Sequence, residues 1–324
     1  MKRFARVALA ALALSLALPA TGALAQAYPT RPVRMIVPFP PGGATDIIAR
    51  LVSDRLTEMW GQTVIVDYKP GAGTVVGTEV VATARADGYT MGMVITAHVL
   101  NPSLRKDMPY DTLKDLAGVS LVAVSHIVIT ATNALPANNI RELIAFAKQN
   151  PGKLNYASPG TGTAMHLAGE LLNTMGGIKI VHVPYRGGAA AYPDVISGRI
   201  ELQIDPMQAS MQNIEAKQVK ALAITSLQRA PNAPNIPTVA ETLPGFNVLS
   251  LSGLVVPAAT PRDIVRKINA DVRKVLDNSE LKTRMGGLGM DPASSASPEE
   301  FDGFIRAEIA KWADVVKQSG MQLD

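Results

Sequence analysis

The chain has 324 residues, of which 31 are Lys or Arg and 27 are Asp or Glu, and it contains no cysteine. The lack of cysteine excludes disulfide bonds, zinc sites built on cysteine and thiol nucleophiles. A chain of this length can bury a core large enough to fold without cross-links, and the length is typical of two domains.

The first 25 residues have the pattern of a secretory signal peptide. Three basic residues precede an apolar run at 7–18, and the small-residue sequence Ala-Leu-Ala ends at Ala25. The run is too short to span a bilayer, so we expect export to the periplasm with cleavage after Ala25. Removing this segment leaves 28 basic residues against 27 acidic ones. A charge near zero gives no reason to expect nucleic acid as a partner.

Strand-like and helix-like segments alternate after the signal, which predicts an α/β protein with mainly parallel sheets. The pattern indicates strands at residues 33–38, 64–68, 90–95, 119–123, 127–130, 154–157, 180–183, 200–204 and 219–225. It indicates helices at residues 45–60, 74–85, 140–149, 164–175, 189–197 and 207–217. A proline-rich passage at 229–237 is followed by a strand at 248–256 and helices at 261–278 and 298–319.

The order of these elements predicts how the chain divides into domains. The two last helices need a sheet to cover, and the simplest partner is the amino-terminal sheet. The chain then crosses between two lobes near Val124 and again near Phe246. We therefore expect a signal peptide at 1–25, a split first domain of 26–123 plus 247–324, and a second domain of 124–246.

Two loops, at residues 39–46 and 158–163, share one design. Each follows a short apolar strand, is rich in Pro, Gly and small hydroxyl residues, and opens a helix with almost no basic residue at its start. The unpaired N–H groups of a helix's first turn carry the positive end of its dipole, so each loop is predicted to bind an anion. At the first loop, the alternative is an ordinary turn in which Thr45 or Asp46 caps the helix.

Four side chains outside these loops complete the candidate site. Asp205 ends a strand where α/β folds place ligands, and it either caps the next helix or contacts a ligand that bears an amine or hydroxyl. Arg186 precedes another helix start and either meets a second carboxylate or is a solvated surface residue. His98 and His166 are candidate hydrogen-bonding partners of the ligand. The four histidines of the chain show no metal-ligand spacing, so we expect no metal.

The predicted ligand-binding residues are therefore Phe39, Pro41, Gly42, Gly43, Ala44, Thr45, Asp46, His98, Ser158, Gly160, Thr161, Gly162, Thr163, His166, Arg186 and Asp205.

Common enzyme signatures are absent from the sequence. It has no Gly-x-Ser-x-Gly elbow, no His-Glu-x-x-His helix and no Gly-Lys-Ser/Thr phosphate loop. Residues 71–77 mimic a dinucleotide fingerprint, but the four residues 67–70 separate the apolar part of the preceding strand from the first glycine. We therefore expect neither catalysis nor a cofactor. With two tryptophans in the chain, no stacking platform for a sugar is evident, and carbohydrate is the weaker cargo.

The run at residues 28–46, YPTRPVRMIVPFPPGGATD, resembles the start of the Bug-type extracytoplasmic solute receptors of tripartite tricarboxylate transporters. Similar motifs follow in the same order: KPGAG at 69–73, ADGYT at 86–90, NP at 101–102, PYD at 109–111, SPGTGT at 158–163, VPYRGG at 183–188 and ALAIT at 221–225. The resemblance covers essentially the whole chain after the signal. It implies an α/β, two-lobed periplasmic binding protein fold with a hinged inter-domain cleft.

The same resemblance implies a ligand and partners. The ligand is a small organic carboxylate held by the two loops, in part through ordered waters, and it is delivered to the membrane subunits of a tripartite tricarboxylate transporter. We expect the receptor to be a monomer. The chain departs from the family pattern at two positions. It has Thr74 where the family usually has Gly, and Pro206 where the family often has Asn. The class of ligand is therefore implied more firmly than the particular acid.

Two other functions stay open at this point. A module that presents the same acid to a membrane sensor kinase needs the same closed complex, so the sequence does not separate it from a transport receptor. An enzyme acting on the acid is the third possibility.

Overall fold

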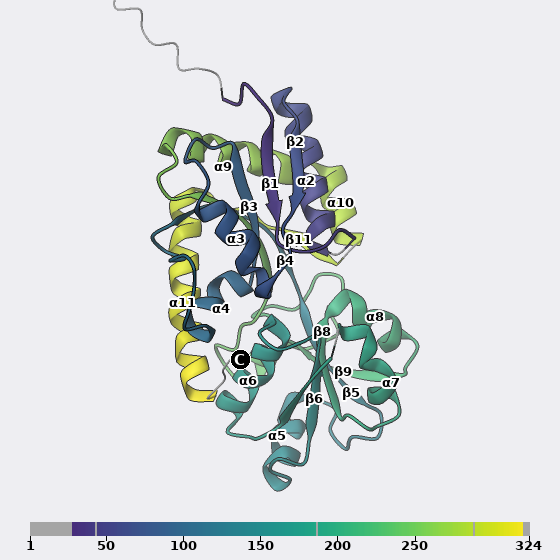
Figure 1. The fold of residues 1–324 in the computed structure, drawn as a ribbon. Helices are drawn as coiled ribbons and strands as arrows, with labels where there is room; N and C mark the ends of the chain where they lie inside the picture. The colour runs from purple at the N-terminus through teal and green to yellow at the C-terminus, as the bar shows by residue number, and fades with distance from the viewer. Residues whose placement is uncertain (1–27, 43, 186, 288, 320–324) are drawn as a thin grey trace, which may run out of the picture. The chain divides into compact units, whose positions relative to one another are not determined.

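A computed structural model describes residues 28–42, 44–185, 187–287 and 289–319. Within residues 31–319 it holds two β-sheets, each flanked by helices (Figure 1). The expected cleavage site after Ala25 and the candidate residues Gly43 and Arg186 lie outside the described residues. In the described part of the chain, no helix is both long enough and apolar enough to cross a membrane.

The first sheet has six strands in the order β11-β4-β10-β3-β1-β2. Its strands are β1 (Val33–Val37), β2 (Val64–Tyr68), β3 (Thr90–Ile95), β4 (Leu116–Ser125), β10 (Ser250–Pro257) and β11 (Met290–Pro292). Its helices are α2 (Ala44–Trp60), α3 (Val75–Ala82), α4 (Ala97–Leu104), α9 (Arg262–Leu276), α10 (Ser279–Gly287) and α11 (Pro298–Ser319), with the short helix η1 (Ala72–Thr74) before α3.

The second sheet has five strands in the order β7-β6-β8-β5-β9. Its strands are β5 (Ile127–Thr132), β6 (Asn155–Ser158), β7 (Val181–Pro184), β8 (Leu202–Pro206) and β9 (Val219–Ile224). The helices of this part are α5 (Ile140–Gln149), α6 (Ala164–Gly176), α7 (Tyr192–Ile196) and α8 (Met207–Glu215), with the short helices η2 (Gly188–Ala190) and η3 (Val239–Glu241).

The expectation of mainly parallel sheets is wrong. Five of the nine strand pairs within the described sheets are antiparallel. The reason is the path of the chain. Strand β4 leaves the first sheet and β10 returns to it, and because these two strands lie side by side, they run in opposite directions.

Several local boundaries also differ from the expectations. The structure contains α4, α10 and β11, for which the sequence pattern predicted no element. The helix expected at 189–197 is divided into η2 and α7. The helix expected from residue 74 begins at Val75, because Ala72, Gly73 and Thr74 have left-handed φ angles of 45°, 60° and 81°.

The chain passes between the sheets through two adjacent segments. A single residue, His126, separates the end of β4 from the start of β5. Its Nδ1 lies 3.0 Å from Ser226 Oγ, just after β9, and its Nε2 lies 2.8 Å from an Asp291 carboxylate oxygen on β11. In the returning segment, Val248 N donates to Thr225 O at 2.9 Å. These bonds join elements of both sheets at the crossing.

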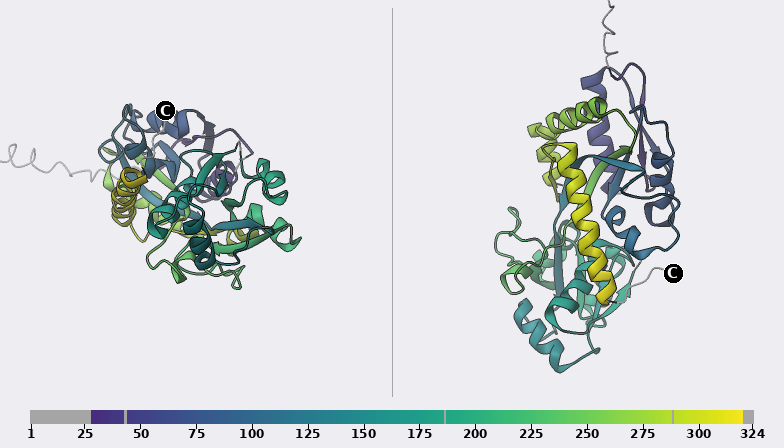
Figure 2. Two further views of the ribbon diagram at one scale, coloured as in Figure 1. Left: turned by 90° about the horizontal axis from the view of Figure 1, so that it is seen from below. Right: turned by 90° about the vertical axis from the view of Figure 1, so that its left-hand side faces the viewer.

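Helix α11 connects the cores of the two sheets. Its Phe301 lies against the first sheet, where a Cβ added to Gly253 would come within 2.3 Å of the Phe301 ring. Further along α11, Trp312 and Val315 are buried in a hydrophobic cluster that also contains Leu167 of α6. Figure 2 shows α11, in yellow, running from the helices of the first sheet down to those of the second. The hydrophobic core is therefore continuous across both sheets.

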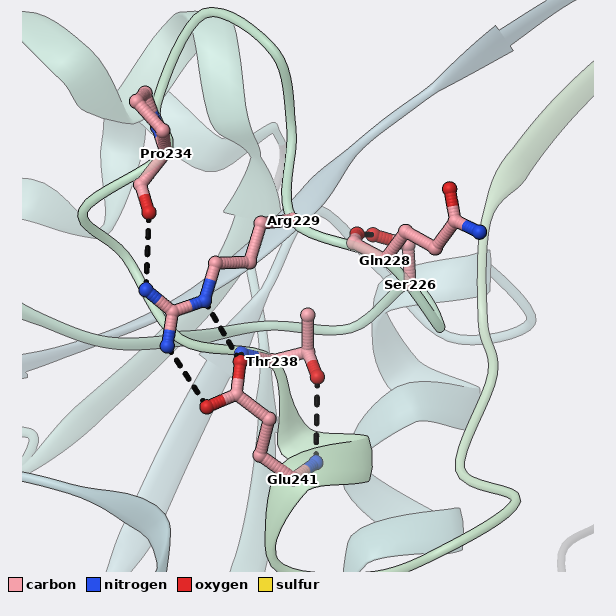
Figure 3. A network of polar contacts seen from close by, with 6 residues as sticks. All are labelled: Ser226, Gln228, Arg229, Pro234, Thr238 and Glu241. Atoms are coloured by element: carbon pink, nitrogen blue, oxygen red, sulfur yellow. Dashed lines mark hydrogen bonds and ion pairs between the residues drawn. The ribbon is translucent and has the colours of Figure 1, made fainter.

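The proline-rich passage folds around one arginine (Figure 3). Arg229 donates from Nε and Nη2 to both carboxylate oxygens of Glu241 at 2.8 Å, and from Nη1 to Pro234 O at 3.0 Å. Glu241 and Thr238 also form a capping box at the start of η3. Hydrogen bonds from Arg229, and then from the Thr238 backbone, lower the pKa of Glu241 to about 2.

We expect Arg229→Leu to lower the melting temperature more at neutral pH than in strong acid. The folded pKa of Glu241 is below its ordinary value of 4.5, so its ionised form stabilises the fold above that pH. This contribution is lost as the pH falls through about 2. Thermal unfolding at pH 7 and near pH 2 tests the prediction, with Arg266→Leu, which removes the exposed Arg266–Glu299 pair, as control. An equal loss at both pH values contradicts it.

Candidate functional site

The two glycine-rich loops lie at the edges of their sheets that are nearest to the crossing. In the first sheet, β4 ends at Ser125 and leads directly into the second sheet. The last residue of β3, Ile95, pairs with Ser252 of β10, which pairs in turn with Ala123 near the end of β4, and β1 runs parallel to β3. In the second sheet, Ile127 at the start of β5 pairs with Pro206 at the end of β8, which is parallel to β6. The carboxyl ends of β1 and β6 therefore both point towards the crossing. In α/β folds such edges bind ligands.

In the first loop, Asp46 stabilises the turn from inside. Its carboxylate accepts hydrogen bonds from Gly42 N at 2.7 Å and Tyr68 Oη at 2.6 Å, and forms an ion pair with Arg50 Nε at 2.9 Å. Burial opposes ionisation, but the bonds from Tyr68, Gly42 and Arg50 outweigh it and lower the pKa of Asp46. Asp46 lies in the first turn of α2, and its carboxylate is therefore engaged within the protein, where it closes the turn at Gly42.

Arg50 is a residue at this loop that the sequence analysis missed. Its guanidinium contacts Asp46 and the Tyr68 hydroxyl, and its side chain is 55% exposed. The signal for it was present in the sequence, because Asp46 and Arg50 are four residues apart on α2 and such pairs face each other. The first loop therefore has a cation within one helical turn.

In the second loop, side chains hold the backbone in its turn. Ser158 Oγ accepts from Gly160 N at 3.2 Å and lies 2.7 Å from His182 Nε2. Thr163 is the N-cap of α6, where its Oγ1 accepts from His166 N at 3.2 Å and donates to Gly160 O at 2.8 Å. Gly160 has a φ angle of 147°, which only glycine adopts readily, and Gly162 has a left-handed φ angle of 77°.

A stacked pair of neutral histidines supports this loop. The rings of His166 and His182 lie 3.9 Å apart at 16°. Burial lowers the pKa of His182 to about 4, and burial together with the charge of His182 lowers the pKa of His166 to about 3. Gly162 N donates to His166 Nδ1 at 3.2 Å, so the ring hydrogen of the neutral His166 lies on Nε2. The backbone carbonyl of His166 accepts a hydrogen bond from Tyr156 Oη at 3.0 Å.

Several N–H groups of the second loop stay unused. The N–H of Gly160 bonds Ser158 and that of Gly162 bonds His166, so neither is available. The N–H groups of Thr161, Thr163, Ala164 and Met165 bond no acceptor among the described residues. These four donors surround the amino end of α6, where the helix dipole favours an anion. The loop therefore has the donors that an anion site requires.

Asp205 lies beneath η2. It is 1% exposed, and a Cβ on Gly188 would come within 2.1 Å of both its carboxylate oxygens. Gln203 Nε2 donates to Asp205 at 3.1 Å and to Gly188 O at 2.9 Å. Burial raises the pKa of Asp205 to about 7, although the bond from Gln203 opposes this shift. Pro206 is the N-cap of α8 and no side chain caps that helix, so the proposed capping role of Asp205 is wrong.

The remaining candidates are placed differently. His98 is buried on α4 and lines a cavity to which neither glycine loop contributes. In the loops themselves, Pro41 and Thr161 are exposed, whereas Phe39 and Thr45 are half-buried. Within the described residues, no group of three or more His, Asp or Glu side chains could hold a metal ion.

Comparison with known proteins identifies the family. The model of the tripartite tricarboxylate transporter family receptor matches residues 48–321. The chain belongs to this receptor family. The match includes the second loop and all five strands of the second sheet. The protein is thus a solute-binding receptor of the periplasmic binding protein fold.

The receptor is similar to known proteins over nearly its whole length. It is 38% identical over 314 residues to the UPF0065 protein in the tcbD-tcbE intergenic region of Pseudomonas sp. (strain P51), covering 96% of this chain and 93% of the relative. It is 35% identical over 302 residues to Protein BugT of Bordetella pertussis, covering 92% of each chain.

Solved structures of similar sequence have the same fold. Rpa4515 of R. palustris, solved with adipate, has 34% identity and a TM-score of 0.77, covering 91% of this chain and 99% of that one. MatC from Rhodopseudomonas palustris, solved with bound malate, has 30% identity and a TM-score of 0.73, covering 89% of this chain and 100% of that one.

Proposed function

We propose that this receptor captures a small organic carboxylate in the periplasm and delivers it to the membrane subunits of a tripartite tricarboxylate transporter. The observation that carries the proposal is the set of four unused N–H groups at the second loop, on a sheet edge that points to the crossing. Relatives solved with adipate and malate support a carboxylate as the ligand class.

Neutral donors of this kind are strong enough for a transport receptor. A hydrogen bond to a charged group contributes about 1.5–3 kcal/mol, and a helix terminus adds about 0.3–1 kcal/mol. Four such bonds and the dipole reach the order of 8 kcal/mol that a micromolar complex requires, before the cost of association. The ligand is then held firmly but reversibly, as delivery demands.

The ligand-binding set of this proposal centres on the second loop. Ser158, Gly160 and Thr163 shape the loop, whereas Thr161 and the first turn of α6 present the donors. Nε2–H of His166 is a further donor near this helix end. From the first loop, residues 39–45 provide the facing wall, and Arg186 provides a contact to a second carboxylate. Asp205, through Gly188, positions the neighbouring η2 segment.

Capture includes a closing motion in this proposal. The two crossing segments at His126 and Val248 form the hinge, and the division into domains 26–123 plus 247–324 and 124–246 follows them. Helix α11 holds the two domains together through Trp312. Closure therefore brings the two glycine-rich loops, at 39–46 and 158–163, towards each other. The mature receptor starts at Gln26 and acts as a monomer.

A transport role is favoured over presentation to a sensor kinase, because the matching family consists of transporter receptors. Catalysis is not part of the proposal, since the same family match describes a receptor. Uptake of the bound acid into vesicles that contain the cognate membrane subunits distinguishes delivery from mere binding.

A calorimetric and thermal-shift screen of the protein from Gln26 onwards, with linear mono- and dicarboxylic acids, tests the ligand class. At 100 times its dissociation constant, a ligand stabilises the fold by about 2.7 kcal/mol, which raises the melting temperature by several degrees. The matched control is the neutral amide of each acid, which lacks the charge. Binding of amides as tightly as acids, or of no acid in the panel, contradicts the proposal.

A further inference from the structure

A small polar cavity lies within the part of the molecule built on the first sheet. Its volume is about 90 Å³, and its walls come from α4, the start of β4, the end of β10, α9 and α11. Polar side chains that line it are His98, Thr112, Arg262, Asp302 and Arg306. Neither glycine-rich loop contributes to its lining, so the cavity is separate from the carboxylate site.

Two buried side chains in this lining have no hydrogen-bonding partner within the protein. His98 is 2% exposed and both of its ring nitrogens are unpartnered, and Thr112 is 6% exposed with an unpartnered hydroxyl. Buried polar groups are almost always bonded, so such a pair beside a cavity indicates a missing partner. Burial lowers the pKa of His98 to about 4, so at neutral pH its ring has one N–H donor and one acceptor nitrogen.

The charged groups of the cavity leave an excess of one positive charge. Asp302 accepts from Gly118 N at 2.6 Å, and Arg262 Nη1 lies 3.9 Å from its other oxygen. Arg306 lies one turn further along α11 and is exposed. Two guanidinium groups therefore face one carboxylate. In a partly enclosed space, this excess attracts an anion more strongly than it would on an open surface.

We propose that this cavity binds a small oxyanion that carries a hydroxyl group, of the kind represented by hydrogen phosphate and bicarbonate. The oxyanion accepts from His98, Thr112 and the two guanidinium groups, and its own hydroxyl donates to the acceptor nitrogen of His98. The cavity is small, with a volume of about 90 Å³, which suits an ion of this size. Sulfate and acetate lack the hydroxyl hydrogen, so the site discriminates against them.

The direct test is nuclear magnetic resonance of the histidine rings in protein labelled with ¹⁵N-histidine. Phosphate, bicarbonate, sulfate and acetate are titrated separately at constant ionic strength and pH above 7. We expect saturable shifts of the His98 signals with phosphate, bicarbonate or both, and binding of sulfate and acetate that is weaker by about tenfold or more. Comparison of the phosphate and bicarbonate titrations identifies which anion fills the site.

Variants connect the signal to the cavity. Arg306→Gln and Thr112→Val are each expected to weaken binding about tenfold or more, because each removes a bond to a charged ligand. Arg266→Gln is the matched control, since it lies one turn from Arg262 on α9 and does not line the cavity. Gly162→Asp should lose carboxylate binding and keep the phosphate response, which separates this proposal from the proposed transport function.

The opposite results overturn the proposal. If the His98 signals do not move saturably with any anion, the cavity holds only water. The same conclusion follows if sulfate binds as well as phosphate does, or if Arg306→Gln and Thr112→Val respond as wild type does. Thermal unfolding of each variant checks that a lost response is not a lost fold.

Discussion

Gly162→Asp is expected to reduce carboxylate affinity by about 100-fold or more while the protein stays folded. The substitution places a negative charge among the four unused N–H groups at the start of α6, where the ligand carboxylate is expected to lie. Gly162 has a φ of 77°, a conformation that Asp tolerates better than most residues. Calorimetric titration with a carboxylate from the screen measures the loss, and circular dichroism confirms the fold.

Two controls isolate the charge. Gly162→Asn has nearly the same shape and backbone preference without the charge, so it should retain much more affinity than Gly162→Asp. Gly177→Asp places an aspartate at another left-handed glycine, φ 58°, at the opposite end of α6, and should bind normally. Wild-type affinity in Gly162→Asp, together with lost binding in Arg50→Ala or Arg186→Ala, would show that a basic side chain provides the binding energy instead.

Asp205→Asn is expected to change how stability depends on pH. The folded pKa of about 7 is above the ordinary 3.8, so between these values the folded state binds a proton that the unfolded state has released. The contribution of Asp205 to the stability of the wild type therefore falls as the pH rises from about 4 to 7. Above pH 7 this contribution no longer changes with pH. Asn does not titrate. The difference in the free energy of unfolding, variant minus wild type, should therefore increase by about 2 to 3 kcal/mol between pH 5 and pH 8.

Urea unfolding of both proteins at the two pH values measures this difference. Asp277→Asn is the matched control, because it makes the same substitution at a side chain that is 82% exposed. If the difference between Asp205→Asn and wild type is the same at pH 5 and pH 8, the buried carboxyl does not titrate as proposed. In binding assays, the same variant should change the order of affinity among amino, hydroxy and unsubstituted acids.

The local sequence was sufficient for elements whose signals are short-range. Strands β2 and β3 and helices α5 and α11 have the predicted bounds. Helix α5 shows why, since Asn139 accepts from Glu142 N and thereby starts the helix at a position that the sequence marks with a capping residue. The second loop was predictable for the same reason, because glycine at positive φ and the Thr163 cap depend on neighbours only a few residues away.

Local sequence patterns did not predict elements that have a weak local signal and are stabilised by tertiary packing. Helix α4 contains Pro102, which argues against a helix in sequence, yet burial of Val99 and Leu100 stabilises it in the core. Strand β11 is only three residues long and forms through its pairing with β4. Such elements owe their stability to partners distant in the chain, and local propensity does not report on these.

Residue composition and spacing thus predicted the positions of the two loops and an anion as their ligand, because both predictions follow from the backbone donors that glycine and a helix start provide. Which donors are free was decided only by tertiary contacts. The Asp46 carboxylate accepts from the Tyr68 hydroxyl because β1 pairs with β2 and brings Tyr68 to the loop. His166 stacks on His182 only because β6 pairs with β7. Strand pairing joins residues far apart in sequence, so no local pattern could predict it.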